Sequence, residues 1–285
     1  MDTDPKHADF TAAIEGVEAR AWSSLAAVVK SEPLFDERGL QAATALFSDS
    51  TYPLANRVVG LGLARPVQPS VLDRILEMYD AAGADSIFIP MAPTARPSTL
   101  PRLLQERGFE PSMKEGKLYR STQDPPRMDS RDRVIAAKEE DHEGVLNLYR
   151  SGGMDADWAN IMAANLGTPG WHHFVALDGD RPVALASLFA SQGFGLCFPG
   201  WTLPAYRHRG YQRALAAHRI AAARELGIGW VSANLDVTDS PIGFTIRSYT
   251  RLGFELLYVR TTFIRQRPNV TVPNAFSRRL LIPHS

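Results

Sequence analysis

The sequence contains one cysteine, Cys197, among 285 residues. An intrachain disulfide is therefore excluded, and so is a metal site built from several cysteines. The seven histidines form neither an HExxH motif nor a short cluster with cysteine, so we expect no bound metal. Cys197 precedes Phe198, and we interpret its side chain as a small apolar filler of the core.

The sequence also lacks long apolar runs and a net charge. No segment approaches the ~20 apolar residues that span a bilayer, and the N-terminal stretch MDTDPKHADF is acidic and polar, unlike a secretory signal peptide. The formal net charge of zero gives no general attraction to nucleic acid or acidic membranes. We therefore expect a soluble, cytoplasmic protein, monomeric or homodimeric, that binds neither nucleic acid nor membranes.

Proline and polar residues divide the chain into two parts. The segment 123–131 combines Pro-Pro with Asp, Gln and Ser and is typical of a linker. Hydrophobic patterns after it predict the element order β-α-α-β-β-β-α-β-α-β over residues 132–265. The remainder, 266–285, carries three prolines without a clear period and is interpreted as a tail.

The first part, 1–122, resembles the end of the second. "LLQERGFEPSMKEGKLYRST" aligns with "SYTRLGFELLYVRTTFIR", so that Gly108-Phe109 corresponds to Gly253-Phe254. Ahead of this match, "FTAAIEGVEARAWSSLAAVV" and "DERGLQAATALF" have helical patterns where a full copy would have strands. We interpret the chain as a degenerate duplicate followed by a complete copy.

The stretch "YRHRGYQRAL" places basic residues around Gly210 where a strand ends and an alanine-rich helix begins. A helix N-terminus has about four unpaired backbone N–H groups and a partial positive charge. Glycine lets a ligand approach the backbone closely, and arginine adds charge-assisted bonds to phosphate. The pattern predicts a phosphate site; a solvated basic helix start is the alternative.

This stretch is similar to the acyl-CoA-binding segment of the GCN5-related N-acetyltransferase (GNAT) superfamily, whose pattern is Arg/Gln-x-x-Gly-x-Gly/Ala after a short strand that ends in proline. Arg207 to Gly210 fit that pattern, whereas Gln212 replaces the small sixth residue. "SYTRLGF" matches the superfamily's second signature at Tyr249, although Ile242 stands where asparagine is usual. The resemblance implies an α/β fold with two GNAT-like mixed-sheet domains in tandem, the N-terminal one truncated and helix-rich.

The resemblance also implies an activity: transfer of an acetyl or other acyl group from acyl-CoA to a small-molecule or peptide amine by direct attack in a ternary complex. Backbone amides from His208 to Arg213 would cradle the pyrophosphate, and the backbone of Trp201 to Leu203 would pair with the pantetheine arm and polarise the thioester carbonyl. The implied cofactor-binding residues are Trp201, Thr202, Leu203, Arg207, His208, Arg209, Gly210, Tyr211, Gln212 and Arg213. No metal is implied.

Catalytic residues are less sharply indicated. Tyr249 matches the tyrosine that often protonates the leaving thiolate, but it also continues a core-facing stripe with Ile242 and Ile246. Asp236, His172 or His173, or a water relay, could serve as the base; the two histidines alternate across a strand, so at most one faces a given site.

Two other features have both a functional and a structural interpretation. Trp201 could line the acceptor pocket or fill the core. Asp155 and Asp157 could attract a cationic amine or cap a helix.

A function without catalysis is also open. The departures at Gln212 and Ile242 are compatible with a non-catalytic acyl-CoA-binding or scaffold module. Nucleic-acid binding through the basic helix is disfavoured by the neutral charge and the few interleaved aromatic residues.

Overall fold

The computed structural model describes residues 5–28, 43–46, 56–127, 133–237, 246–247 and 249–267. Its described residues form two compact units. The first holds those up to Glu115 together with Val259 to Arg267, and the second holds those from Gly116 to Tyr258.

The boundary between the units falls inside two strands, β4 (Glu110–Ser121) and β10 (Glu255–Gln266), and each strand contributes one segment to each unit. The division therefore does not follow the expected linker, 123–131. Residues 123–127 belong to the second unit and 128–131 lie outside the described residues, as does the expected tail beyond Arg267. Composition marks polar breaks, but it cannot show where a long strand exchanges one set of neighbours for another.

The first unit combines three helices with short strands. Its remaining elements are α1 (Pro5–Val28), β1 (Thr44–Leu46), β2 (Arg57–Val59), α2 (Pro69–Ala81), β3 (Ser86–Met91) and α3 (Leu100–Gln105). β1 is antiparallel to β2, β2 is parallel to β3, and β3 is antiparallel to β10. Helices α2 and α3 pack on this sheet through Leu72, Ile75, Leu100 and Leu104. The helical interpretation of "DERGLQAATALF" is wrong at Thr44–Leu46, because short β1 finds its partner in β2 and tertiary pairing overrides local propensity.

A buried cluster of charged side chains joins α1 to β10 within the first unit. The Arg260 guanidinium donates to both carboxylate oxygens of Glu15 at 2.9 and 2.7 Å, to Glu18 at 2.8 Å and to Glu115 at 3.1 Å. These carboxylates raise the pKa of Arg260 although burial opposes the rise. Because each charge is buried and hydrogen-bonded, removing Arg260 would leave carboxylates uncompensated in the interior.

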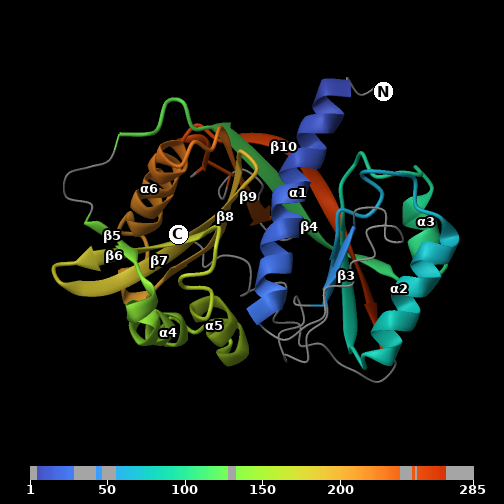
Figure 1. Cartoon of the computed structure of the whole chain (residues 1–285), viewed down its shortest axis with the longest axis horizontal. Coiled ribbons are helices and arrows are strands. Elements are labelled where there is room, and N and C mark those ends of the chain that lie inside the picture. Colours follow the sequence, from blue (N-terminus) through green and yellow to red (C-terminus); the bar gives the residue numbers. More distant parts are fainter. Residues whose placement is uncertain are drawn as a thin grey trace. The chain divides into compact units, whose positions relative to one another are not determined.

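The second unit is a mixed sheet with helices on both faces (Figure 1). Its further elements are β5 (Val134–Ala137), the 3₁₀ turn Glu139–Asp141, α4 (His142–Ser151), α5 (Ala156–Ala163), β6 (Trp171–Asp178), β7 (Arg181–Ser191), β8 (Phe194–Thr202), the 3₁₀ turn Pro204–Tyr206, α6 (Tyr211–Glu225) and β9 (Trp230–Asp236). The strand order is β4-β9-β8-β7-β6-β5. β5 to β8 are antiparallel neighbours, whereas β8 and β9 are parallel and are connected by α6. Neighbouring parallel strands need a crossover connection between them, and α6 provides it for β8 and β9.

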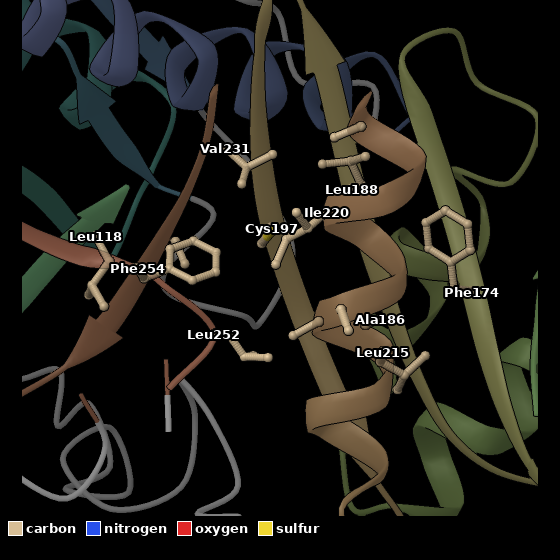
Figure 2. Packing of buried hydrophobic residues seen from close by; sticks show 14 of the residues in the cluster. Leu118, Phe174, Ala186, Leu188, Cys197, Leu215, Ile220, Val231, Leu252 and Phe254 are labelled. Atoms are coloured by element: carbon tan, nitrogen blue, oxygen red, sulfur yellow. The ribbon is translucent and has the colours of Figure 1, made fainter. Parts of the chain in front are cut away.

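Helix α6 supplies the core of this unit on one face of the sheet. Leu215 and Ile220 pack against Leu188 of β7, Cys197 of β8 and Val231 of β9 (Figure 2). The helix ends at Gly227, which has φ +74°: its amide bonds to the Arg224 carbonyl, and the next amide bonds to the Ala223 carbonyl. This pair of bonds is a Schellman motif. In the described part of the chain, no helix is long and apolar enough to cross a bilayer.

Candidate active site

Strands β8 and β9 part in the middle of the second unit. Their parallel pairing runs from Phe194 opposite Trp230 to Cys197 opposite Ala233 and ends there. Both strands nevertheless continue, β8 to Thr202 and β9 to Asp236. Beyond Cys197 and Ala233, the described residues of these two strands do not pair with each other.

A β-bulge shapes β8 at the same point. Leu188 of β7 is opposite Cys197, but Ala186 is opposite Gly200, so Phe198 and Pro199 together face the single residue Ser187. A bulge bends its strand and increases the local twist. The bulge carries β8 away from β9 just where the pairing stops.

The open edge of β8 can be assigned to particular residues. The Leu203 amide donates to the Val183 carbonyl at 3.0 Å, so the backbone of Leu203 faces β7. Successive residues of an antiparallel strand direct their N–H and C=O groups to opposite edges. Trp201 therefore also faces β7, whereas Gly200 and Thr202 face the open edge toward β9. Of the three residues expected to pair with an extended ligand, only Thr202 presents its backbone to that edge.

The turn between β8 and α6 presents backbone amides to solvent. His208 and Gly210 both have left-handed backbone conformations, with φ of +63° and +91°. Such a turn directs successive N–H groups into one concavity that suits an anion. Gly210 is the N-cap of α6, and its lack of a side chain leaves the first-turn amides without a side-chain acceptor. A Cβ at Gly210 would meet no atom within 4 Å, so the space next to this residue is open. Its positive φ, and not a lack of space, is the reason that glycine is required here.

The arginines of this turn have different surroundings. The Arg207 Nε atom lies 3.3 Å from the Thr202 carbonyl and donates to it. The Arg209 guanidinium lies 5.1 Å from the ring centre of Tyr206, and Arg181 of β7 lies 5.5 Å from the same ring. Arg213 is exposed on the first turn of α6. Positive charge therefore surrounds the concavity on several sides.

Gln212, which departs from the expected small residue, lies over β8. Its Nε2 atom donates to the Thr202 hydroxyl at 2.8 Å. A Cβ placed on Gly200 would lie 2.3 Å from its Oε1 atom. The Gln212 side chain thus covers the α6-facing side of β8 at the open edge.

Tyr249 and Arg219 lie near the point where the strands part. Tyr249 packs on Phe254 with ring centres 5.2 Å apart and contacts the core cluster that contains Cys197. Its hydroxyl also interacts with Arg219, a side chain of α6 that is 1% exposed. Burial raises the pKa of Tyr249, and the positive charge of Arg219 opposes that rise. Tyr249 is therefore both part of the core and close to the splayed strands.

Arg219 also supports the bulge. Its Nη1 atom donates to the Ser187 carbonyl at 3.2 Å, and its Nε atom has no hydrogen-bond partner among the described residues. Sequence reasoning missed this residue, although a signal was present: an arginine one residue before Ile220 interrupts the apolar stripe of α6. Cys197 is buried as expected, and burial raises the pKa of its thiol.

The candidate bases differ in environment. Asp236 ends β9 beyond the last residue paired with β8 and is half-buried. His173 is buried on the face opposite α6, where its Nδ1 atom lies 2.8 Å from the Ser187 hydroxyl. Burial lowers its pKa to about 4, so the ring is neutral. His172 faces the α6 side with Phe174, and burial lowers its pKa too.

Two acceptor-site candidates have structural roles in the fold. The Asp155 carboxylate accepts a hydrogen bond from the Trp158 amide at 3.1 Å and is the N-cap of α5. Trp201 is buried, and a Cβ on Gly152 would lie 1.8 Å from its Nε1 atom. Ile242 lies outside the described residues. Among the described residues, no group of histidine, cysteine and carboxylate side chains could hold a metal ion.

Comparisons with known proteins agree with this geometry. Residues 131–254 match the Acetyltransferase (GNAT) family model. A GCN5-related N-acetyltransferase from Kribbella flavida superposes with a TM-score of 0.63 at 18% identity, over 88% of this chain and 96% of that one. A GCN5-related N-acetyltransferase from Sphaerobacter thermophilus superposes with a TM-score of 0.56 at 15% identity, over 76% of this chain and 74% of that one.

A third solved structure, described as a tandem GNAT protein from the clavulanic acid biosynthesis pathway (without AcCoA), has a TM-score of 0.54 at 12% identity, over 75% of this chain and 76% of that one. At these identities the likeness shows the fold alone. A search of curated proteins found no match.

Proposed function

We propose, from the match of residues 131–254 to the Acetyltransferase (GNAT) family model, that the protein transfers an acetyl or other acyl group from acyl-CoA to an amine. The observation that carries the proposal is one continuous arrangement: the open edge of β8 leads directly into the amide concavity at the start of α6. A ligand with a peptide-like arm and a pyrophosphate head needs these two surfaces in this order.

The residues present fit such a ligand. The amides of His208 to Arg213 form the concavity for phosphate, and Arg207, Arg209 and Arg213 add positive charge around it. Gly200 and Thr202 offer backbone groups on the open edge of β8. We assign the arm to these two residues rather than to Trp201 and Leu203, because the latter pair faces β7. Acyl-CoA supplies the acyl group as a thioester.

Acyl transfer requires one C–N bond to form and one C–S bond to break. The amine loses a proton as it attacks the carbonyl carbon, and the departing thiolate gains one. We assign the second step to Tyr249, whose raised pKa keeps its hydroxyl protonated at neutral pH. Asp236 at the end of β9 is proposed as the base, directly or through water.

We further propose that the first unit is a degenerate GNAT-like domain without an acyl-CoA site. Its helix α3 ends as the helical residues around Tyr249 do: Gly108 and Gly253 are left-handed at φ +79° and +80°, and each following phenylalanine is buried. The Phe109 amide bonds to the Leu104 carbonyl, and the Phe254 amide bonds to the Tyr249 carbonyl, both at 3.1 Å. Leu104 therefore occupies the position in the first unit that corresponds to Tyr249, the proposed acid of the second unit.

The start of α2 also supports this difference. Helix α2 begins at Pro69 after Gln68, with no basic residue in "VQPSVLD". At these positions the first unit therefore has neither the glycine N-cap nor the tyrosine of the second, while Arg65 and Arg74 flank the start of α2. A structural or substrate-shaping role is proposed for it.

Titration calorimetry with acetyl-CoA, followed by a thiol-release assay over a panel of small and peptide amines, tests the proposal. Binding with thiol release that depends on an amine supports the transferase. Binding without release on any amine would instead favour a non-catalytic acyl-CoA-binding module, which the departure at Gln212 makes the second candidate. Absence of binding would contradict both.

A further inference from the structure

Thr202 is held from both sides of the turn that precedes α6. Its carbonyl accepts a hydrogen bond from Arg207, before Gly210, and its hydroxyl accepts one from Gln212, after Gly210. Thr202 is 3% exposed, so its side chain has little alternative contact with water. The last residue of β8 is therefore fastened to the helix that carries the amide concavity.

Gly200 makes the Gln212 contact sterically feasible. A Cβ at residue 200 would lie 2.3 Å from Gln212 Oε1, a distance at which one atom must move. Gly200 is not among the residues with a left-handed backbone, so its conformation does not require glycine. The missing side chain instead leaves room for the Gln212 amide to lie along β8.

We infer that the Gln212 side chain is a tie that sets the spacing between the open edge of β8 and the amide concavity of α6, and so positions both halves of the acyl-CoA site for one extended ligand. This inference rests on the proposed function. It gives the motif departure at Gln212 a positive role, because a small residue there could not reach Thr202.

The tie should raise affinity by holding the β8 edge and the α6 concavity in place before the ligand binds. A ligand that binds two surfaces at once gains affinity only when their separation matches its own length. If the tie is removed, the β8 end and the start of α6 move more independently, and binding the whole ligand must order them again. A fragment that contacts only one surface does not have to order the two surfaces relative to each other, so its affinity should not depend on the tie. The tie should therefore matter for coenzyme A and not for its phosphate-bearing head.

The test compares two probes by titration calorimetry: coenzyme A, and adenosine 3′,5′-bisphosphate, which has phosphates and no pantetheine arm. The variants are Gln212→Met, which keeps the side-chain length and removes the amide, and Thr202→Val, which removes the acceptor. Each should weaken coenzyme A binding about five- to tenfold while the bisphosphate changes less than about twofold. The double variant should be no weaker than either single one, because both remove the same contact.

Two further variants sharpen the comparison. Gly200→Ala should reproduce the selective loss, because its methyl group displaces the Gln212 amide. Arg224→Ala, at an exposed position on the last turn of α6, should leave binding of both probes unchanged and serves as the matched control. Thermal unfolding of every variant shows whether the fold is retained.

Three results would overturn the inference. Coenzyme A binding that is unchanged or tighter in Gln212→Met would make Gln212 an obstacle rather than a tie. An equal loss for both probes would place Gln212 in the phosphate concavity alone. Failure of the unmodified protein to bind coenzyme A would overturn the proposed function as well, which distinguishes that outcome from the first two.

Discussion

The Cys197 and Ala233 residues form the last pair between β8 and β9, and beyond them the two parallel strands separate. A helix crossover alone does not require this separation. The separation coincides with the bulge at Phe198 and Pro199, which bends β8, and the Arg219 guanidinium donates to the Ser187 carbonyl opposite that bulge.

Tyr249→Phe should reduce turnover about 100-fold while coenzyme A affinity changes less than about twofold, because a general acid contributes to the chemical step and not to cofactor binding. Steady-state kinetics and calorimetry on the same preparation check this. An acid must be protonated to act, so activity is lost only as the pH rises through its pKa. Because burial raises that pKa above its ordinary value of 10, turnover should show no alkaline limb due to Tyr249 in the neutral range. Unchanged turnover in Tyr249→Phe would assign the residue to the core alone.

Arg219→Met should lower kcat about tenfold with little change in KM for acyl-CoA. The guanidinium next to the Tyr249 hydroxyl stabilises the phenolate that proton donation leaves behind, so its loss makes Tyr249 a weaker acid. Arg219→Lys, which keeps the positive charge, should recover part of the rate. If lysine and methionine give the same kcat, the charge is not the property that matters, and Arg219 only supports the bulge.

Gly152→Ala should destabilise the protein by about 1–3 kcal/mol, because its methyl group would overlap the buried Trp201 indole and force repacking. Gly144→Ala, inside the helix α4 that Gly152 caps, is the matched control. A Cβ there meets no atom within 4 Å, so replacing a helical glycine should stabilise by about 0.5–1 kcal/mol. Urea unfolding of the two variants should give shifts of opposite sign; shifts of the same sign would contradict the packing of Trp201.

Because of buried His173, we expect the stability of the protein to depend on pH. Its pKa is about 4 in the folded protein and about 6.5 when exposed, so the unfolded chain binds the extra proton more readily. Stability is then complete above pH ~6.5 and falls as the pH drops toward 4, by about 3 kcal/mol. Replacement by asparagine, which does not titrate and retains an amide near Ser187, should remove this part of the acid sensitivity.

Sequence patterns predicted the second unit well, because its elements are long and separated by clear breaks. The hairpin at Gly179, the α6 start at Gly210 and the α6 end at Gly227 all lie where backbone chemistry requires them. The first unit was harder. β1 is too short to show a period of two, and no pattern in β4 or β10 marks the point where each strand passes from one unit to the other.

The site shows the same division between local and tertiary information. The amide concavity follows from the local sequence around Gly210. The bulge could not be predicted, because it exists only in the register of β8 against β7. The orientation of Gly200 and Thr202 toward the open edge depends on that register too. In the linear motif Gln212 is only a departure from the usual small residue, and its contact with Thr202 across the turn is what gives it a role.

The most direct test of the central claim is calorimetric titration of acetyl-CoA into the protein and into its Gly210→Asp variant. Aspartate adds bulk and negative charge at the mouth of the amide concavity, so the variant should bind at least about 100-fold more weakly. Gly227→Asp, at the opposite end of α6, carries a similar left-handed strain and should bind like the unmodified protein. Equal affinity in Gly210→Asp and the unmodified protein would contradict an acyl-CoA site at this turn.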